Sequence, residues 1–124
     1  MKSLSALSLA ILAGCYTAAP AGEHVWNLKL PKSVALETKL VFRAEAHTPD
    51  GTPVQGVPYV WRVDWVGVQG TRHQGRSFED EKITAKGQPG TAVVRVFGYG
   101  PHESLIEVAS GTVDVTAAAQ PPAD

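Results

Sequence analysis

Alternation of apolar and polar side chains is the feature that most constrains how this chain can fold. Apolar residues occupy every second position in the segments 26–30, 40–46, 59–65 and 92–96. A period of two places alternate side chains on opposite faces of an extended strand, whereas an amphipathic helix needs a period near 3.6. After residue 14, no helical period continues for two turns. The sequence therefore predicts an all-β domain.

Turn-forming residues divide this domain into about seven short strands. Pro31 interrupts the 26–30 segment, which suits an edge strand, and the aromatic 59–65 segment is expected at the centre of a sheet. Turns are predicted at 48–51, 86–90 and 98–101, and a loop at 67–75. A strand over 76–84 would be anchored by Phe78 and Ile83, and the last strand, 105–116, would bulge at Ser110-Gly111. This spacing predicts an immunoglobulin-like β-sandwich of about seven antiparallel strands.

The N-terminus carries a targeting segment. A basic start, Met1-Lys2-Ser3, precedes an apolar stretch over 4–13, which is too short for the ~20 residues that span a bilayer. The stretch ends in Leu12-Ala13-Gly14-Cys15, which resembles the lipobox of bacterial lipoproteins. That resemblance implies cleavage before Cys15, a diacylglyceryl group on its thiol and a further acyl chain such as palmitate on its new amino group. More than one chain gives stable membrane anchoring.

The chain is accordingly divided into four parts. Residues 1–14 are predicted to be a lipoprotein signal peptide, 15–23 the lipidated cysteine with a flexible tether, 24–116 the sandwich and 117–124 a disordered tail. Tyr16 stands where the inner-membrane retention signal has Asp, so the resemblance favours the outer membrane of a Gram-negative cell. An alternative stays open, because Ala19-Pro20-Ala21 could serve as a cleavage site that releases a soluble protein beginning at Gly22.

Three segments of the domain carry a second resemblance. Tyr59-Val60-Trp61-Arg62-Val63-Asp64, the 88–96 segment and the closing 111–115 segment resemble PKD-like and bacterial immunoglobulin-like domains, in which a buried Trp lies on an aromatic strand. The 50–57 segment is similar to a turn of many surface sandwich domains. These resemblances imply an extracytoplasmic sandwich.

Charge and composition exclude several classes of function. The formal charge is −1, and loss of Lys2 with the signal peptide would make it −2, so no basic footprint for nucleic acid exists. The single cysteine can form neither an internal disulfide nor a thiolate metal cage. No Gly-x-Ser-x-Gly elbow is present. We expect no enzyme activity and no cofactor.

Aromatic side chains outside the predicted core are the candidate binding residues. Tyr99, between two glycines, and Trp65, near a strand end, could each form a stacking platform for a sugar or a peptide, whereas Trp61 and Trp26 are expected in the core. We expect no metal site. His47 and His102 are nevertheless placed at one end of the sandwich by the predicted topology, and 79–81 is an acidic run without the spacing of a calcium loop.

Together these features predict a lipid-anchored cell-envelope protein. Its immunoglobulin-like module would be a non-enzymatic binding or structural unit that contacts an envelope protein or a glycan, and a free sheet edge could also pair with a partner strand. The alternative is a lipid-anchored domain that binds carbohydrate or a small ligand.

Overall fold

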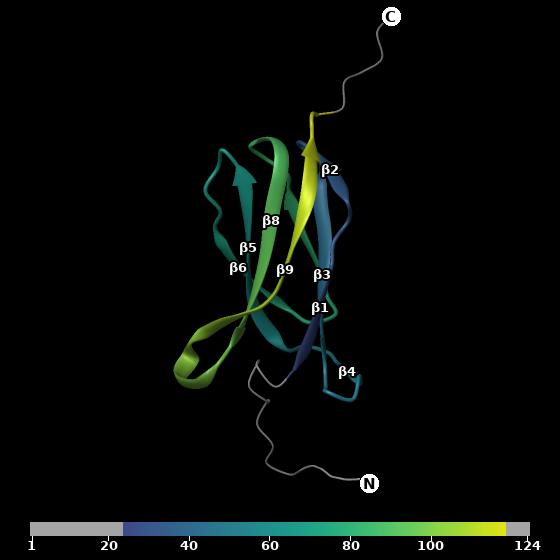
Figure 1. Ribbon diagram of the computed structural model, residues 1–124, viewed down its shortest axis with the longest axis vertical. Coiled ribbons are helices and arrows are strands. Elements are labelled where there is room, and N and C mark those ends of the chain that lie inside the picture. The colour runs from purple at the N-terminus through teal and green to yellow at the C-terminus, as the bar shows by residue number, and fades with distance from the viewer. Residues whose placement is uncertain (1–23, 119–124) are drawn as a thin grey trace, which may run out of the picture.

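A computed structural model describes residues 24–118 of the chain, and within this range two β-sheets face each other (Figure 1). The four-stranded sheet contains β1 (Val25–Lys29), β3 (Lys39–His47), β4 (Pro53–Val54) and β7 (Asp80–Thr84). The five-stranded sheet has the order β2 (Ser33–Ala35), β9 (Leu105–Thr116), β8 (Gln88–Tyr99), β5 (Pro58–Val66) and β6 (Arg72–Arg76). The predicted immunoglobulin-like β-sandwich is confirmed.

The chain changes sheets at Pro31. β1 forms an edge of the four-stranded sheet by pairing with β3, as predicted, and β2 then joins the other sheet after only three residues. Because proline cannot donate a backbone hydrogen bond, it ends the β1 pairing. β2 enters beside β9 and runs parallel to it. The expectation that all strands are antiparallel is therefore wrong for this one pair.

The core lies between β3 of one sheet and β5 and β8 of the other. β5 has β8 on one side and the edge strand β6 on the other, so it is an interior strand, although β8 is the middle strand of the five. Its alternation sends the aromatic residues inward, where Trp61 meets Phe42 edge to face with ring centroids 4.9 Å apart. Trp61 is 3% exposed and Phe42 2%. Such pairs add to the energy of burial itself.

Residues 72–75, predicted to be part of a loop, form the strand β6 together with Arg76. This segment has no apolar alternation because it is a sheet edge, paired only with Pro58–Arg62 of β5 among the described strands. The predicted 76–84 strand is also shorter, since β7 begins at Asp80. Phe78 lies in the intervening turn with φ of +67° and packs its ring against His47. Ser77 takes the buried position instead, where its hydroxyl accepts from Val57 N at 2.9 Å.

The β8–β9 hairpin differs from expectation at three points. β8 already begins at Gln88, inside the predicted 86–90 turn, and it continues through Tyr99, so the break comes at Gly100 and a 3-10 turn, η2 (Pro101–Glu103). The β9 irregularity lies at Val108 rather than at Ser110-Gly111, because Val96 pairs with Ala109 and Phe97 with Glu107. An extra residue bends the bulged strand, and Figure 1 shows the hairpin leaving the body of the sandwich.

The strands span Val25–Thr116. Cys15, the signal peptide and the tether all lie outside the described residues, as does the tail from residue 119. Within 24–118, no helix has the length and apolar character needed to cross a membrane.

Candidate functional site

The outer face of the five-stranded sheet carries apolar side chains that the core does not use. Strand register places Val60 opposite Phe97, and Tyr99 opposite Leu105. Pro58 stands beside Tyr99, since the next pair along is Tyr59 with Gly98. We call Pro58, Val60, Phe97, Tyr99 and Leu105 the Tyr99 face. Val60 is 7% exposed although it points away from the core, which shows how closely these neighbours cover it.

Three arginines lie in a row across the strands, directly beyond the Tyr99 face. Arg62 pairs with Arg72 on one side and with Arg95 on the other. Asp64 separates two of these charges, because its carboxylate accepts from Arg62 Nε at 2.7 Å and from Arg95 Nη1 at 2.6 Å. The Arg72 guanidinium has no hydrogen bond or ion pair to any residue of the described part of the chain. One cation is thus left available beside the apolar surface.

A hollow of about 330 Å³ lies where β6 meets the β8–β9 hairpin, and we call it the outer hollow. Its apolar lining comes from Val60, Leu105 and Tyr99. Its polar lining includes Arg72 and Gln74 from β6, with Glu103 from η2. Apolar lining with a few polar groups of defined position is typical of ligand sites, and the volume is at the lower end of the ~300–1,000 Å³ that such sites have.

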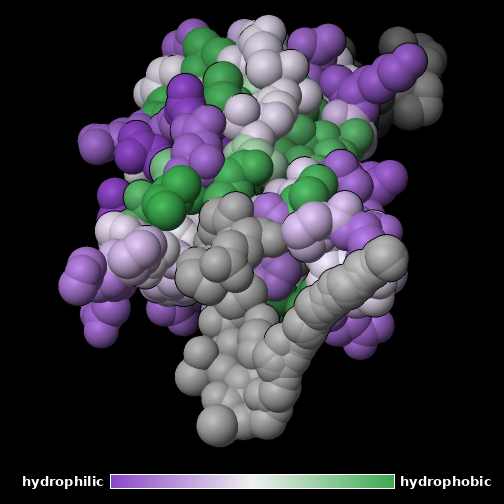
Figure 2. Space-filling model, turned by 60° about the horizontal axis from the view of Figure 1, so that its bottom comes forward, coloured by the Kyte–Doolittle hydropathy of each residue, from purple (hydrophilic) through white to green (hydrophobic). Residues whose placement is uncertain are grey.

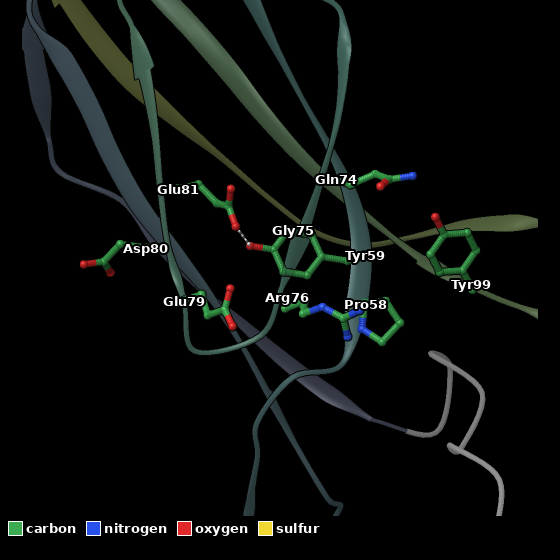
Figure 3. A pocket seen from close by; sticks show the side chains of 9 residues that line it. All are labelled: Pro58, Tyr59, Gln74, Gly75, Arg76, Glu79, Asp80, Glu81 and Tyr99. Atoms are coloured by element: carbon green, nitrogen blue, oxygen red, sulfur yellow. Dashed lines mark hydrogen bonds between the residues drawn. The ribbon is translucent and has the colours of Figure 1, made fainter.

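A second hollow, of about 360 Å³, lies around the edge of the sandwich between β6 and β7, and we call it the edge hollow. Figure 3 shows Gln74 and Tyr99 on one side of it and the acidic residues Glu79, Asp80 and Glu81 on the other. Gln74 and Tyr99 line both hollows. The two hollows therefore border the same two side chains and follow one another along the edge strand β6.

The Tyr59–Glu81 pair forms the inner wall of the edge hollow. Tyr59, fully buried, donates its hydroxyl hydrogen to Glu81 Oε2 at 3.1 Å (Figure 3). Burial raises the pKa of the Glu81 carboxyl above its ordinary value, and burial followed by the Glu81 charge raises the pKa of Tyr59. The buried Trp61 Nε1 has no partner at hydrogen-bonding distance among the described residues. It nevertheless lies near enough to Glu81 to offset part of the rise in the Glu81 pKa.

Gly75 on β6 makes room for this pair. A Cβ at this position would lie 2.4 Å from Glu81 Oε2 and 2.8 Å from both Cζ and the hydroxyl oxygen of Tyr59. Two residues before Gly75, His73 stacks on Trp61 with ring centroids 4.3 Å apart and planes inclined by 24°. His73 Nε2 is 2.9 Å from Thr71 Oγ1. The edge strand is thus fitted to the core beneath it.

The two predicted platform residues have different surroundings. Tyr99 is 37% exposed and borders both hollows, so its ring is accessible from solvent. Trp65 is 6% exposed and belongs to the core, so its indole has no open face on which a ligand could stack. Its burial does not support Trp65 as a platform.

The histidine and acidic candidates are dispersed. β3 and the β8–β9 hairpin, which carry His47 and His102, end on opposite sides of the same end of the sandwich (Figure 1). Asp80 forms an ion pair with Arg43 at 3.0 Å. Among residues 24–118, no group of three or more His, Cys, Asp or Glu side chains is placed to hold a metal ion.

Sequence reasoning missed most of the residues around Tyr99. Arg72 and Gln74 fell in the predicted loop, and Val60 and Leu105 were assigned only to strands. A signal did exist, because Val60 and Phe97 are apolar at positions of the alternation that point to solvent. Such residues mark an outer face that is less polar than a sandwich requires.

Comparison with known proteins leaves the site to be judged on this chain's own residues. No protein-family profile matches the sequence. A search of curated proteins finds no match either. Among solved structures, the chain is similar to a CARDB domain from Pyrococcus furiosus, whose crystal structure was determined in complex with di-metal ions. The two are 12% identical, with a TM-score of 0.38 over 82% of this chain and 94% of that one.

Proposed function

We propose that this chain is a lipid-anchored cell-envelope protein whose immunoglobulin-like domain acts by binding, without catalysis, and that the Tyr99 face is its contact surface. The supporting observation is a group of apolar side chains on an outer sheet face that no described element covers. One face of such a sheet packs on the core, and the other is normally polar. An apolar group rimmed by charges is characteristic of interaction sites.

The proposed anchor would hold this surface close to a membrane. His24 follows Cys15 by nine residues, which reach at most ~30 Å when fully extended. β1 begins at the end of the sandwich where the β8–β9 hairpin also turns (Figure 1), and Figure 2 shows hydrophobic surface among hydrophilic residues at that end. A lipidated Cys15 would therefore keep the Tyr99 face near the bilayer, and near the outer membrane in a Gram-negative cell.

Binding without catalysis is supported by the structural contacts that three potential catalytic side chains make. The Ser77 hydroxyl is buried and engaged with Val57 N and Val54 O. The Ser104 hydroxyl donates to Pro101 O within η2. The His73 ring is stacked on Trp61. These groups stabilise the fold, and the proposed function needs none of them as a nucleophile or base.

A second candidate, a carbohydrate or small ligand in place of a protein partner, is favoured by the outer hollow. A flat protein surface would need only the exposed apolar side chains. The hollow adds an aromatic ring and polar groups that converge on a space of about 330 Å³. Convergence of this kind is expected for a ligand that enters a concave site.

Mass spectrometry and fractionation test the anchor. The protein purified from membranes is expected to begin at an acylated Cys15, and Cys15→Ala is expected to abolish lipidation. An unmodified N-terminus at Gly22, with the protein free of membranes, would instead establish the soluble alternative.

Site-specific photo-crosslinking in intact cells tests the contact surface. A benzophenone amino acid replacing Leu105 is expected to form a crosslinked species, because Leu105 lies on the Tyr99 face. The matched control replaces Val41, which is 40% exposed on the outer face of the opposite sheet. Equal crosslinking from both positions, or none from Leu105, would contradict the proposed surface.

A further inference from the structure

The two hollows lie one after the other along the edge strand β6, the outer hollow at residues 72–74 and the edge hollow at residues 74–76, and together we call them the groove. Tyr99 and Gln74 line both hollows, so a ligand that occupies both would contact these two side chains where it passes from one hollow to the other. Each part, at about 330 and 360 Å³, has the size of a small ligand site rather than of an extended protein interface. A ligand of two or more linked small units matches this shape.

The charged side chains along the groove are of both signs. Arg72 and Glu103 border the outer hollow. Arg76 borders the edge hollow together with three acidic side chains. Of these, Asp80 is paired with Arg43 and Glu81 accepts the Tyr59 hydroxyl hydrogen, which leaves Glu79 as the carboxylate opposite Arg76. A ligand of one charge would be attracted at one side of each part and repelled at the other. An uncharged ligand with groups that both donate and accept hydrogen bonds is compatible with every one of these side chains.

The polar side chains of the groove end in planar groups, and each group can form two hydrogen bonds side by side. A guanidinium offers donors in a fixed fork, a carboxylate offers two acceptor oxygens, and the Gln74 amide offers both. Neighbouring hydroxyls on a sugar ring present this pattern. Beside them, the exposed ring of Tyr99 and the apolar surface of Val60 and Leu105 suit the C–H face of the same ring.

We propose that the groove binds an uncharged saccharide of two or more rings, which stacks on Tyr99 and extends past Gln74 from the outer hollow into the edge hollow. This inference rests on the proposed function, because it names the class of ligand that the Tyr99 face takes. The free Arg72 guanidinium and Glu103 would hydrogen-bond the hydroxyls of the first ring, while Arg76 and Glu79 would do so for the second.

A strand of a partner protein added to the free edge of β6 is the competing occupant. Arg72 and Arg76 flank this short strand, and charged residues on an edge oppose the addition of a strand. Strand addition would also leave the convergent groups of the outer hollow unused. The saccharide therefore accounts for more of the observed side chains.

Titration calorimetry with the full-length lipoprotein in detergent micelles tests the inference. The probes are maltotetraose, cellotetraose and tetra-N-acetylchitotetraose, each with its monosaccharide, and a hyaluronan tetrasaccharide as an acidic counterpart. At least one neutral tetrasaccharide is expected to bind more tightly than its monosaccharide. Tyr99→Ala is expected to weaken that binding roughly tenfold, and Tyr99→Phe to change it less than about twofold, since the ring is kept.

Val41→Ala, on the opposite face, is the matched control and is expected to leave binding unchanged. Thermal melting of each variant separates lost binding from lost folding, and Arg72→Gln provides a second variant on an exposed side chain. Binding of the acidic tetrasaccharide alone would overturn the saccharide class named here while sparing the proposed function. Absence of saccharide binding together with Leu105-specific crosslinking to a protein would do the same, and absence of both would overturn the two proposals.

Discussion

Substitution of Gly75 by alanine tests how tightly β6 is fitted to the wall of the edge hollow. The new Cβ would lie 2.4 Å from Glu81 Oε2 and 2.8 Å from the Tyr59 hydroxyl oxygen. The Glu81 carboxylate can swing outward, because it is the end of a partly exposed side chain. Tyr59 cannot, because it is fully buried between the sheets. We therefore expect Gly75→Ala to break the Tyr59–Glu81 hydrogen bond and to press on the Tyr59 ring.

The expected cost follows from these separate effects. Leaving a buried hydroxyl without its partner costs about 1–3 kcal/mol, and overpacking a fixed ring about 1–3 kcal/mol. Alanine offsets about 0.5–1 kcal/mol by restricting the unfolded chain. The net loss in the free energy of unfolding is then about 1–5 kcal/mol, with a central value of about 3 kcal/mol. With a urea m-value of about 2 kcal/mol/M, the central value corresponds to a fall of about 1.5 M in the urea midpoint.

Urea unfolding followed by tryptophan fluorescence measures this loss, and a double-mutant cycle identifies its cause. In a Glu81→Ala background the 2.4 Å contact no longer exists, so Gly75→Ala should cost clearly less there than in the native chain. A Gly75→Ala variant as stable as the native protein would refute the assigned packing. Additive effects of the two substitutions would refute the part assigned to Glu81.

Three further perturbations address the core, the charges and the pH response. Phe42→Ala should lower the free energy of unfolding by about 3–5 kcal/mol, because a buried ring that packs on Trp61 is lost; an unchanged urea midpoint would contradict this. Asp64→Asn should cost about 1 kcal/mol at low salt, since it leaves the guanidinium groups of Arg62 and Arg95 adjacent, and high salt should reduce the loss. Burial raises the pKa of Glu81, so the folded state binds that proton more tightly than the unfolded one. The stability that Glu81 contributes should therefore fall as pH rises from about 4.5 through the pKa of the folded state. In a pH series of urea midpoints, Glu81→Gln should lack this pH-dependent fall.

The strands that pack the core could be predicted, and the edge strand could not. β3 and β5 bury one face each, and burial on one face imposes a period of two on the side chains. β6 is held to β5 by backbone hydrogen bonds, which every residue except proline can form. Its Arg-His-Gln-Gly-Arg sequence therefore has no signature of a strand. Phe78 was misassigned for a related reason, since an apolar residue can also pack from a turn.

The candidate site was predictable only at Tyr99. Glycines on both sides predicted a loop here, whereas the structure makes Tyr99 the last residue of β8 and leaves it partly exposed. Its neighbours Val60 and Gln74 are 39 and 25 residues away in the chain and meet it through the register of β5, β6 and β8. A shift of register by one residue would reverse every face, so the composition of the site follows from pairing that the sequence does not display. Trp65 illustrates the converse, since alternation placed it in the same phase as Trp61 and hence in the core.

Hydroxyl-radical footprinting of Tyr99 tests the central claim most directly, because it reports whether the Tyr99 face is occupied in the cell. Oxidation of Tyr99 and Leu105 would be compared between intact cells and the purified protein, with Val41 on the opposite face as the internal reference. If the face is a contact surface, Tyr99 and Leu105 should be oxidised several-fold less in cells while Val41 changes little. Equal oxidation of Tyr99 in both samples, relative to Val41, would contradict the account.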